Sequence, residues 1–253
     1  MARHRAAAGG IGAIATLDPG LVLGAYSVGV FPMADGRDAS DVYWVEPKDR
    51  AILPLDGFRC SRSLRKVIAA DRFRVTADAA FGDVLALCAQ SVAGRPETWI
   101  NRQIERVFGD LHARGFAHSI ECWDGDQLVG GLYGLALGRA FFGESMVSRS
   151  TNASKVALAW LVARLRIGGY TLLDCQFQTA HLATLGAIEI GRSDYMVLLG
   201  EALSGLVAPP SSLAAGALDA DFRALDRGWT SPSGTVSAPP TGKDIAQLFV
   251  QTS

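Results

Sequence analysis

The sequence predicts an α+β fold built on one mixed sheet, and two observations support this. Strand patterns follow one another at residues 118–123, 127–137 and 139–145, with hairpin turn signals between them. A helix pattern at 154–167 then leads directly into a strand pattern at 171–175. A helix that returns the chain to the same sheet makes a right-handed crossover, which adds a parallel pair to the antiparallel hairpins.

A small N-terminal α/β unit is expected over residues 1–57. Its helix is predicted to begin at the capping residue Asp18, which precedes a proline, and to end at Gly29. Residues 42–45 and 51–53 are predicted to be strands, each stopped by a proline. The residues before the helix are expected to form a flexible tail rather than a cleaved targeting segment.

A larger unit is expected over residues 58–204. Besides the strands and the helix above, its helix patterns lie at 62–70, 79–90, 102–114 and 179–185. From about residue 205 the composition shifts to Ala, Pro, Ser and Gly, which predicts a C-terminal extension over 205–253. Within it, linkers are expected at 208–212 and 237–240, and a short helix at 244–250.

Composition excludes several classes of protein. Hydrophobic residues make up 49% of the 253 residues and charged residues 19%, which is typical of a globular chain. No apolar run reaches the roughly 20 residues of a membrane helix, so no membrane partner is expected. The four cysteines and four histidines are scattered. We therefore expect free thiols in the reducing cytoplasm and no metal site.

One basic cluster stands out although the net charge is only −1. Between residues 59 and 74 a single acid, Asp71, stands among six cations: Arg59, Arg62, Arg65, Lys66, Arg72 and Arg74. Such a cluster can hold phosphates and make binding sensitive to salt. An ordinary solvated helix face remains the alternative.

Polar residues end two of the apolar strand patterns. Glu144 follows two phenylalanines and a glycine, and Asp174 and Gln176 share one face of the next strand because side chains alternate. Buried polar groups of this kind need partners. Glu144 either holds an amine or caps the N-terminus of the helix expected to begin around residues 152–155. Asp174 and Gln176 either serve a chemical role or are a satisfied hydrogen-bond pair, and the residues alone leave these interpretations open.

Two tryptophans also have two interpretations. Trp44 lies in a predicted strand of the N-terminal unit, and Trp99 lies just before a predicted helix. Trp44 either stacks on a nucleobase or joins two small layers of the fold, and Trp99 either lines a pocket or packs against its neighbours. The residues alone do not decide between these roles.

An ordered set of motifs runs through residues 17–200. The set is Gly-Val-Phe-Pro-Met (29–33), Trp-x-x-Pro-x-x-Arg (44–50), Thr-Trp-Ile (98–100), Gly-x-Ala-His-Ser-x-Glu-x-Trp (115–123), Leu-Val-Gly-Gly-Leu-Tyr-Gly (128–134), Gly-Glu-Ser-Met-x-Ser (143–148), Ala-Ser-Lys (153–155), Leu-Asp-Cys-Gln (173–176), His181 and Leu-Gly-Ala (185–187). This combination resembles the leucyl/phenylalanyl-tRNA–protein transferases.

The resemblance implies a small N-terminal domain and a larger, GNAT-like acyltransferase domain. It implies transfer of Leu, Phe or Met from aminoacyl-tRNA to the N-terminal amine of proteins that begin with Arg or Lys. Such products are marked for N-end-rule degradation. No cofactor is expected, because an aminoacyl ester is already activated. We expect the protein to act as a monomer.

The resemblance also assigns site residues. Asp174 and Gln176 fall in the catalytic motif, and Glu144 falls in the Gly-Glu-Ser-Met motif. Our hypothesis is that Asp174, aided by Gln176, holds the acceptor amine and takes up a proton directly or through a relay. Glu144 would orient the site or hold the amine of the aminoacyl group. The alternative is that Asp174 only positions the substrate and the ribose hydroxyl relays the proton.

Further residues carry over to substrate binding. Trp44 and Trp99 match positions near the aminoacyl-adenosine end, and Leu132 and Met146 would line the pocket for the amino acid side chain. Relatives often carry Met where this chain has Leu132, which leaves the preferred amino acid open. The family contacts the tRNA acceptor arm with the segment that here holds Arg62, Arg65 and Lys66.

Two alternative functions fit part of the sequence. A CoA-dependent acetyltransferase of GNAT type needs a glycine-rich loop for pyrophosphate, and the segment 130–143 offers no such loop opening a helix. A non-catalytic RNA-binding module would use the basic cluster and the aromatic residues. It would leave Glu144, Asp174 and Gln176 without a chemical purpose.

Overall fold

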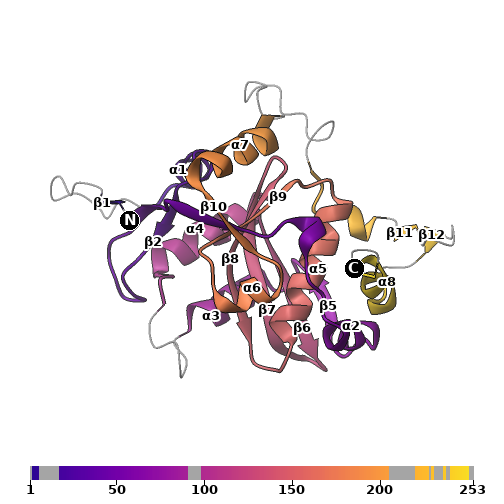
Figure 1. The fold of residues 1–253 in the computed structure, drawn as a ribbon. Helices are drawn as coiled ribbons and strands as arrows, with labels where there is room; N and C mark the ends of the chain where they lie inside the picture. The colour runs from indigo at the N-terminus through magenta and orange to yellow at the C-terminus, as the bar shows by residue number, and fades with distance from the viewer. Residues whose placement is uncertain are drawn as a thin grey trace.

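The computed structural model describes residues 2–5, 17–90, 98–204, 220–227, 229–230, 236–237 and 240–250 (Figure 1). At its centre is a seven-stranded sheet. The order across the sheet is β10 (Ile188–Gly191), β4 (Asp49–Ile52), β9 (Leu172–Gln176), β8 (Ala140–Ser148), β7 (Gln127–Leu137), β6 (Ala117–Asp124) and β5 (Arg74–Ala77). Neighbours are antiparallel except β8 and β9, which are parallel. The predicted α+β class with a mixed sheet is confirmed, and the likeness to GNAT enzymes stays a prediction.

The hairpins and the crossover form as predicted. Asp124 pairs with Gln127 around Gly125, whose φ of 59° is the left-handed conformation that a tight turn requires. β7 and β8 follow as a second hairpin. The helix α5 (Ala153–Ile167) then carries the chain from β8 to its parallel neighbour β9.

A smaller sheet forms beside the large one. It contains β1 (Ala2–Arg5), β3 (Tyr43–Glu46) and β2 (Phe31–Met33), in that order. Residues 2–5 are thus a strand rather than a flexible tail, and residues 6–16 of the predicted tail lie outside the described residues. The predicted helix is α1 (Pro19–Ser27): the Asp18 carboxylate accepts from the Leu21 amide at 3.0 Å, and Gly29 follows with φ 78°.

One strand lies in a different sheet from the one the sequence indicates. The strand predicted at 51–53 is β4, and it lies between β9 and β10 instead of in the N-terminal unit. Ala51 pairs with Gln176 and Ile52 with Asp174. A short buried strand carries no local mark of its sheet, because pairing is decided by distant partners. The unit boundaries at residues 57 and 204 stay predictions.

The predicted helices are present with small shifts at their ends. They are α2 (Arg62–Ala69), α3 (Phe81–Ala89), α4 (Arg102–Ala113) and α6 (Ala180–Thr184). The strands β5 and β10 and the helix α7 (Arg192–Leu203) have no counterpart among the sequence predictions. The two strands are short and lie at the sheet edges. In α7 the adjacent Leu198 and Leu199 differ, the first exposed and the second buried, so no clean apolar stripe marks the helix.

The C-terminal extension contributes several short elements. They are η4 (Ala224–Asp226), β11 (Trp229–Thr230), β12 (Val236–Ser237) and α8 (Gly242–Leu248), and η1 (Leu55–Gly57) is a similar short turn earlier in the chain. The helix expected at 244–250 begins two residues earlier, where Thr241 and Asp244 form a capping box. The linker predicted at 208–212 lies outside the described residues, and so does the middle of the one at 237–240.

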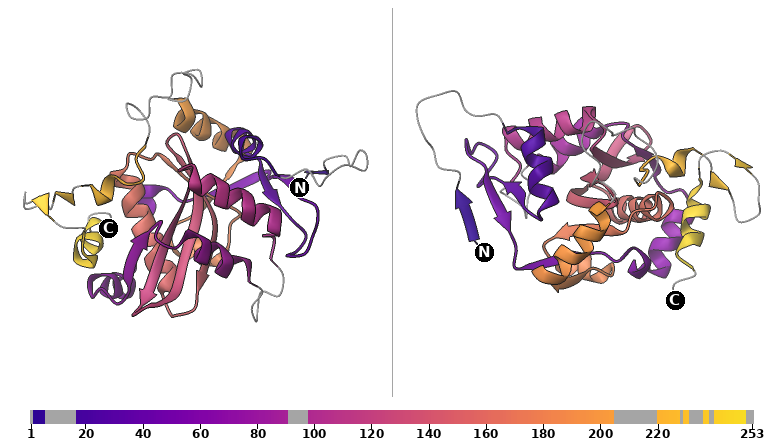
Figure 2. Two further views of the ribbon diagram at one scale, coloured as in Figure 1. Left: turned by 180° about the vertical axis from the view of Figure 1, so that it is seen from behind. Right: turned by 90° about the horizontal axis from the view of Figure 1, so that it is seen from above.

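Helices cover both faces of the large sheet (Figure 2). On one face α1, α3, α4 and α7 contribute to one apolar core. On the other face α2, α5 and α8 contribute to a second core, and α8 lies beside α2 (Figure 1). Among the described residues, no helix has both the length and the apolar character needed to cross a bilayer.

Candidate functional site

The site forms where β8 and β9 separate. Their parallel pairing ends at Phe142 and Asp174, although both strands continue. Glu144 and Gln176 each come two residues after that last pair. Glu144 is also the extra residue of a bulge, because Tyr133 of β7 pairs with Ser145 while the next residue pairs with Gly143. The bulge and the parting of the strands turn these two side chains toward one another.

Gln176 bridges the gap between the strands. Its Nε2 donates to Glu144 Oε1 at 2.9 Å. Its own φ is 62°, an uncommon conformation for a residue other than glycine. Two contacts hold this turn: the Gln176 amide donates to Asp174 Oδ1 at 2.7 Å, and the Phe177 amide donates to the Cys175 carbonyl at 2.7 Å. Strained backbone of this kind is typical of functional sites.

Glu144 is a buried carboxyl with one oxygen in use. Besides the Gln176 amide, Tyr26 of α1 donates its hydroxyl to Glu144 Oε1 at 2.7 Å. Glu144 Oε2 is buried and has no hydrogen-bond partner among the described residues. Burial raises the pKa of Glu144 from its ordinary 4.5 to about 7, against the opposing effect of the two hydrogen bonds. The carboxyl therefore changes charge near neutral pH.

Asp174 forms a buried ion pair with Arg50 next to the Gln176–Glu144 pair. Arg50 of β4 donates its Nε to Asp174 Oδ1 at 2.9 Å and its Nη2 to Oδ2 at 2.5 Å, and both side chains are almost fully buried. Tyr195 of α7 donates to the same Oδ2 at 2.9 Å. The Arg50 guanidinium lies 4.7 Å from the ring centres of Phe31 and Tyr195. Both carboxylate oxygens of Asp174 thus accept hydrogen bonds from donors of the protein itself.

The neighbours of the two acids are held in their donating forms. Burial and the Glu144 carboxylate raise the pKa of Tyr26 well above its ordinary value. Burial and Asp174 do the same for the pKa of Tyr195. Burial acts to lower the pKa of Arg50, but Asp174 outweighs it and raises that pKa. Both phenols and the guanidinium therefore remain donors at every physiological pH.

A cavity of about 290 Å³ opens beside the Gln176–Glu144 pair. Its volume is at the lower end of the range for ligand pockets, about 300–1,000 Å³. Most of the apolar wall comes from Leu132, Met146, Leu158, Leu161, Leu173 and Leu182, with Tyr133, Cys175 and Phe177 beside them. Glu144, Gln176, Thr179 and His181 add polar groups, and Trp99 lies at the same cavity. Burial, followed by the nearby Lys155, lowers the pKa of His181.

Several residues singled out in the sequence meet at this cavity. Glu144, Gln176, Trp99, Leu132 and Met146 all line it. The chemical roles assigned to these five residues stay predictions.

Two others lie elsewhere. Asp174 is fully buried with its oxygens paired, and it is not among the lining residues. Trp44 is half-buried in β3, where it pairs with Pro32 in the small sheet, and it does not line the cavity either. Direct contact of these two residues with a ligand in the cavity is not supported by this geometry, and their assigned roles also stay predictions.

The sequence predictions assigned no role to Tyr26, Arg50 and Tyr195. Arg50 ends the Trp-x-x-Pro-x-x-Arg motif, so a signal for it existed. Its partner Asp174 is 124 residues away along the chain, and no local pattern links the two. Tyr26 and Tyr195 sit inside helices, where an aromatic residue usually indicates core packing.

The basic cluster begins just before α2 and ends just after it, and none of its residues lines the cavity. Arg62 and Lys66 are exposed and Arg65 is half-exposed. Among the described residues, none of these three has an acidic partner within salt-bridge distance. By contrast, Arg72 pairs with Asp124 at 2.6 Å. The three cations of α2 are therefore available to an external anion.

Comparison with known proteins agrees across the chain. Residues 15–48 match the family model of the leucyl/phenylalanyl-tRNA protein transferase N-terminal domain, and residues 52–200 match the model of leucyl/phenylalanyl-tRNA protein transferase. A leucyl/phenylalanyl-tRNA–protein transferase of Rhizorhabdus wittichii is 62% identical, with 94% of this chain and 99% of that protein covered. A protein of the same name in Novosphingobium aromaticivorans is 48% identical, with 94% and 97% covered.

One solved structure, that of L-PGS from Bacillus licheniformis, is a distant match. It is 13% identical, covers 61% of this chain and 51% of that chain, and gives a TM-score of 0.38. A likeness at that level carries over no function.

Proposed function

Because this chain belongs to the leucyl/phenylalanyl-tRNA–protein transferase family, it uses an aminoacyl-tRNA donor and a protein acceptor, and we propose its substrates and its chemistry. It transfers Leu, Phe or Met to the N-terminal amine of proteins that begin with Arg or Lys, which marks them for N-end-rule degradation. The observation that carries this proposal is the apolar cavity with the Gln176–Glu144 pair at its wall.

The cavity suits the side chain of the donor amino acid. Leu, Phe and Met are apolar and unlike in shape, and a wall built of leucines with Met146 accepts all three. The ester carbonyl would then lie beside Gln176 and Glu144, with Trp99 near the terminal adenosine. Leu132 shapes the cavity wall and therefore contributes to the choice among the three donors.

The reaction forms one bond and breaks one. The acceptor nitrogen bonds to the ester carbonyl carbon, the bond from that carbon to the ribose oxygen breaks, and the proton lost by the amine ends on the ribose oxygen. An α-amine has a pKa of about 7.7–8.0, so part of it is already neutral near pH 7. The main contribution of the enzyme is to hold amine and ester in contact. No cofactor enters this balance.

Glu144 is the residue we assign to proton transfer. Its pKa of about 7 lies near the operating pH, as an efficient acid–base group requires, and its Oε2 is not engaged by the described residues. Asp174 acts as a positioning residue instead of taking up the proton directly. It fixes the Gln176 turn through the Gln176 amide, and its oxygens are held by Arg50 and Tyr195.

The tRNA is held by three cations of α2: the exposed Arg62 and Lys66 and the half-exposed Arg65. We also propose that the protein works as a monomer in the cytoplasm. All four cysteines are free thiols, which suits a reducing compartment.

The direct test mixes the protein with Phe-tRNA and a synthetic peptide that begins with Arg, followed by mass spectrometry. We expect a gain of one phenylalanyl residue on the peptide. The matched control is the same peptide with an acetylated N-terminus, which has no amine to react and should stay unchanged. Absence of any gain with Leu-, Phe- and Met-tRNA would refute the proposed substrates.

A further inference from the structure

A segment of the C-terminal extension packs into the same apolar core that supplies the leucines of the cavity wall. Residues 220–227 reach the end of α5, where the Asp221 amide donates to the Gly168 carbonyl at 2.9 Å. A Cβ at Gly168 would lie only 2.4 Å from the Asp221 carbonyl oxygen, so only glycine permits this approach. The glycine at position 168 therefore allows the extension to pack closely on the end of α5.

Arg164 of α5 forms hydrogen bonds and an ion pair with residues 222–226 of the extension. Its guanidinium donates to both carboxylate oxygens of Asp226, at 2.6 and 2.7 Å, and to the Phe222 carbonyl at 2.8 Å. The Arg164 side chain is only 4% exposed. Arg164 follows Leu161, a residue of the cavity wall, by three positions, so the two lie on the same side of α5.

The ring of Phe222 fills a slot over the sheet. It stacks on His118 of β6 with centroids 4.0 Å apart and on Phe141 of β8 with centroids 5.7 Å apart. Those strands flank β7, and two strand spacings are about 10 Å, which is the room that one sandwiched ring needs. Gly134 of β7 makes room for the Phe141 ring: a Cβ there would lie 2.4 Å from that ring and 2.3 Å from the Phe142 carbonyl oxygen.

Phe141 connects this slot to the cavity. It is the register partner of Leu173 in β9, and Leu173 lines the cavity. Phe141 is fully buried and Phe222 is 4% exposed, so the two rings and Leu173 belong to one continuous packed core. Cores packed in this way transmit a loss of volume to their neighbours.

From these contacts we infer that Phe222 is a positioning residue that sets the depth of the donor cavity by holding Phe141 against Leu173. This inference rests on the proposed function, because it takes the cavity as the pocket for the donor side chain. The extension would then be part of the substrate-binding domain instead of an appendage. Removing the Phe222 ring lets Phe141 shift away from Leu173 and deepens the cavity, which favours the larger phenylalanyl group over the leucyl group.

The test measures binding of two probes that cannot be transferred. They are 3′-amino-3′-deoxyadenosine carrying leucine or phenylalanine through an amide, titrated by calorimetry into the full chain. We expect the ratio of the leucyl Kd to the phenylalanyl Kd to rise about 10-fold in Phe222→Ala, the scale of one methylene in an apolar pocket, and less in Phe222→Leu. Phe222→Leu serves alone if the alanine variant does not fold.

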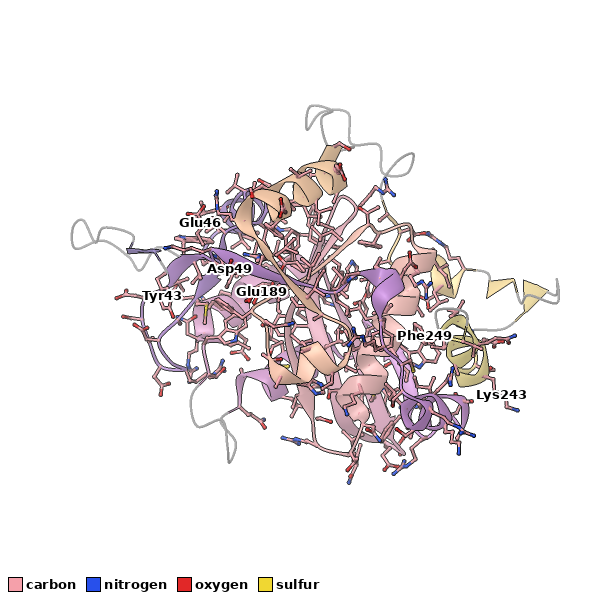
Figure 3. All side chains as sticks on the ribbon, in the orientation of Figure 1. Tyr43, Glu46, Asp49, Glu189, Lys243 and Phe249 are labelled. Atoms are coloured by element: carbon pink, nitrogen blue, oxygen red, sulfur yellow. The ribbon has the colours of Figure 1, made fainter. Side chains whose placement is uncertain are left out.

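The matched control is Phe249→Leu. Phe249 is the other buried phenylalanine of the extension, and it packs on Phe58 at 5.0 Å instead of on Phe141. It lies on the side of α8 that faces the molecule, whereas Lys243 points outward (Figure 3). This variant should lower the unfolding temperature as Phe222→Leu does, but leave the Kd ratio unchanged.

The outcomes separate the two proposals. A Kd ratio in folded Phe222→Leu equal to that of the wild type, or an equal shift in Phe249→Leu, overturns the role of Phe222 and leaves the proposed function standing. Failure of both probes to bind the wild-type protein overturns the cavity assignment itself, and with it this inference.

Discussion

The charge of Glu144 should make the free energy of unfolding depend on pH in a way that one substitution removes. Glu144 is buried, and its pKa in the folded protein is about 7 against an ordinary 4.5. Between these two values the folded chain binds more protons than the unfolded chain, so the free energy of unfolding falls as pH rises. The stabilisation is complete below about pH 4.5 and is lost as pH rises through about 7.

The magnitude follows from the size of the pKa change. At about 1.4 kcal/mol per unit, the rise from 4.5 to about 7 corresponds to roughly 3 kcal/mol. Glu144→Gln keeps the shape of the protonated carboxyl and its carbonyl acceptor for Tyr26, but it does not titrate. The free energy of unfolding of Glu144→Gln, minus that of the wild type, should therefore grow by roughly 3 kcal/mol between pH 4 and pH 8.

Urea denaturation followed by circular dichroism at several pH values measures this difference. The control is Glu189→Gln, an exposed glutamate of β10 labelled in Figure 3, whose difference curve should be flat. If the Glu144→Gln curve is also flat, Glu144 does not carry a raised pKa. Our assignment of proton transfer to it would then lose its physical basis.

Two further predictions follow from the buried ion pair and from α2. Asp174→Ala leaves Arg50 buried without its partner, so the free energy of unfolding, measured by thermal or chemical denaturation, should fall by about 3–5 kcal/mol. A fall of less than about 1 kcal/mol would contradict a buried ion pair between these two residues. Replacing Arg62, Arg65 and Lys66 together by Ala should raise the KM for charged tRNA, leave kcat unchanged, and reduce the slope of log KM against log salt by about 2. If the salt slope does not change, these side chains form an ordinary solvated helix face and do not bind tRNA.

Part of the secondary structure could be predicted from the sequence alone. The Asp18 cap and Gly29 bound α1, and Asp124-Gly125 fixes the β6–β7 hairpin, because capping and turn geometry involve only neighbouring residues. The motif order identified the family and pointed to Glu144 and Gln176, which do meet at one cavity.

The tertiary structure decided what those residues can do. Asp174 looked like a group facing a substrate, yet Arg50 occupies its carboxylate from β4, a strand that the local pattern assigned to another unit. Phe222 lies in an extension whose composition suggested linkers, yet its ring lies between the rings of His118 and Phe141 on one face of the large sheet. Sequence determined the short-range elements because their energies act over a few residues. The partner of a buried charge and the occupant of a gap depend on contacts tens to more than a hundred residues apart, which exist only once the sheet has assembled.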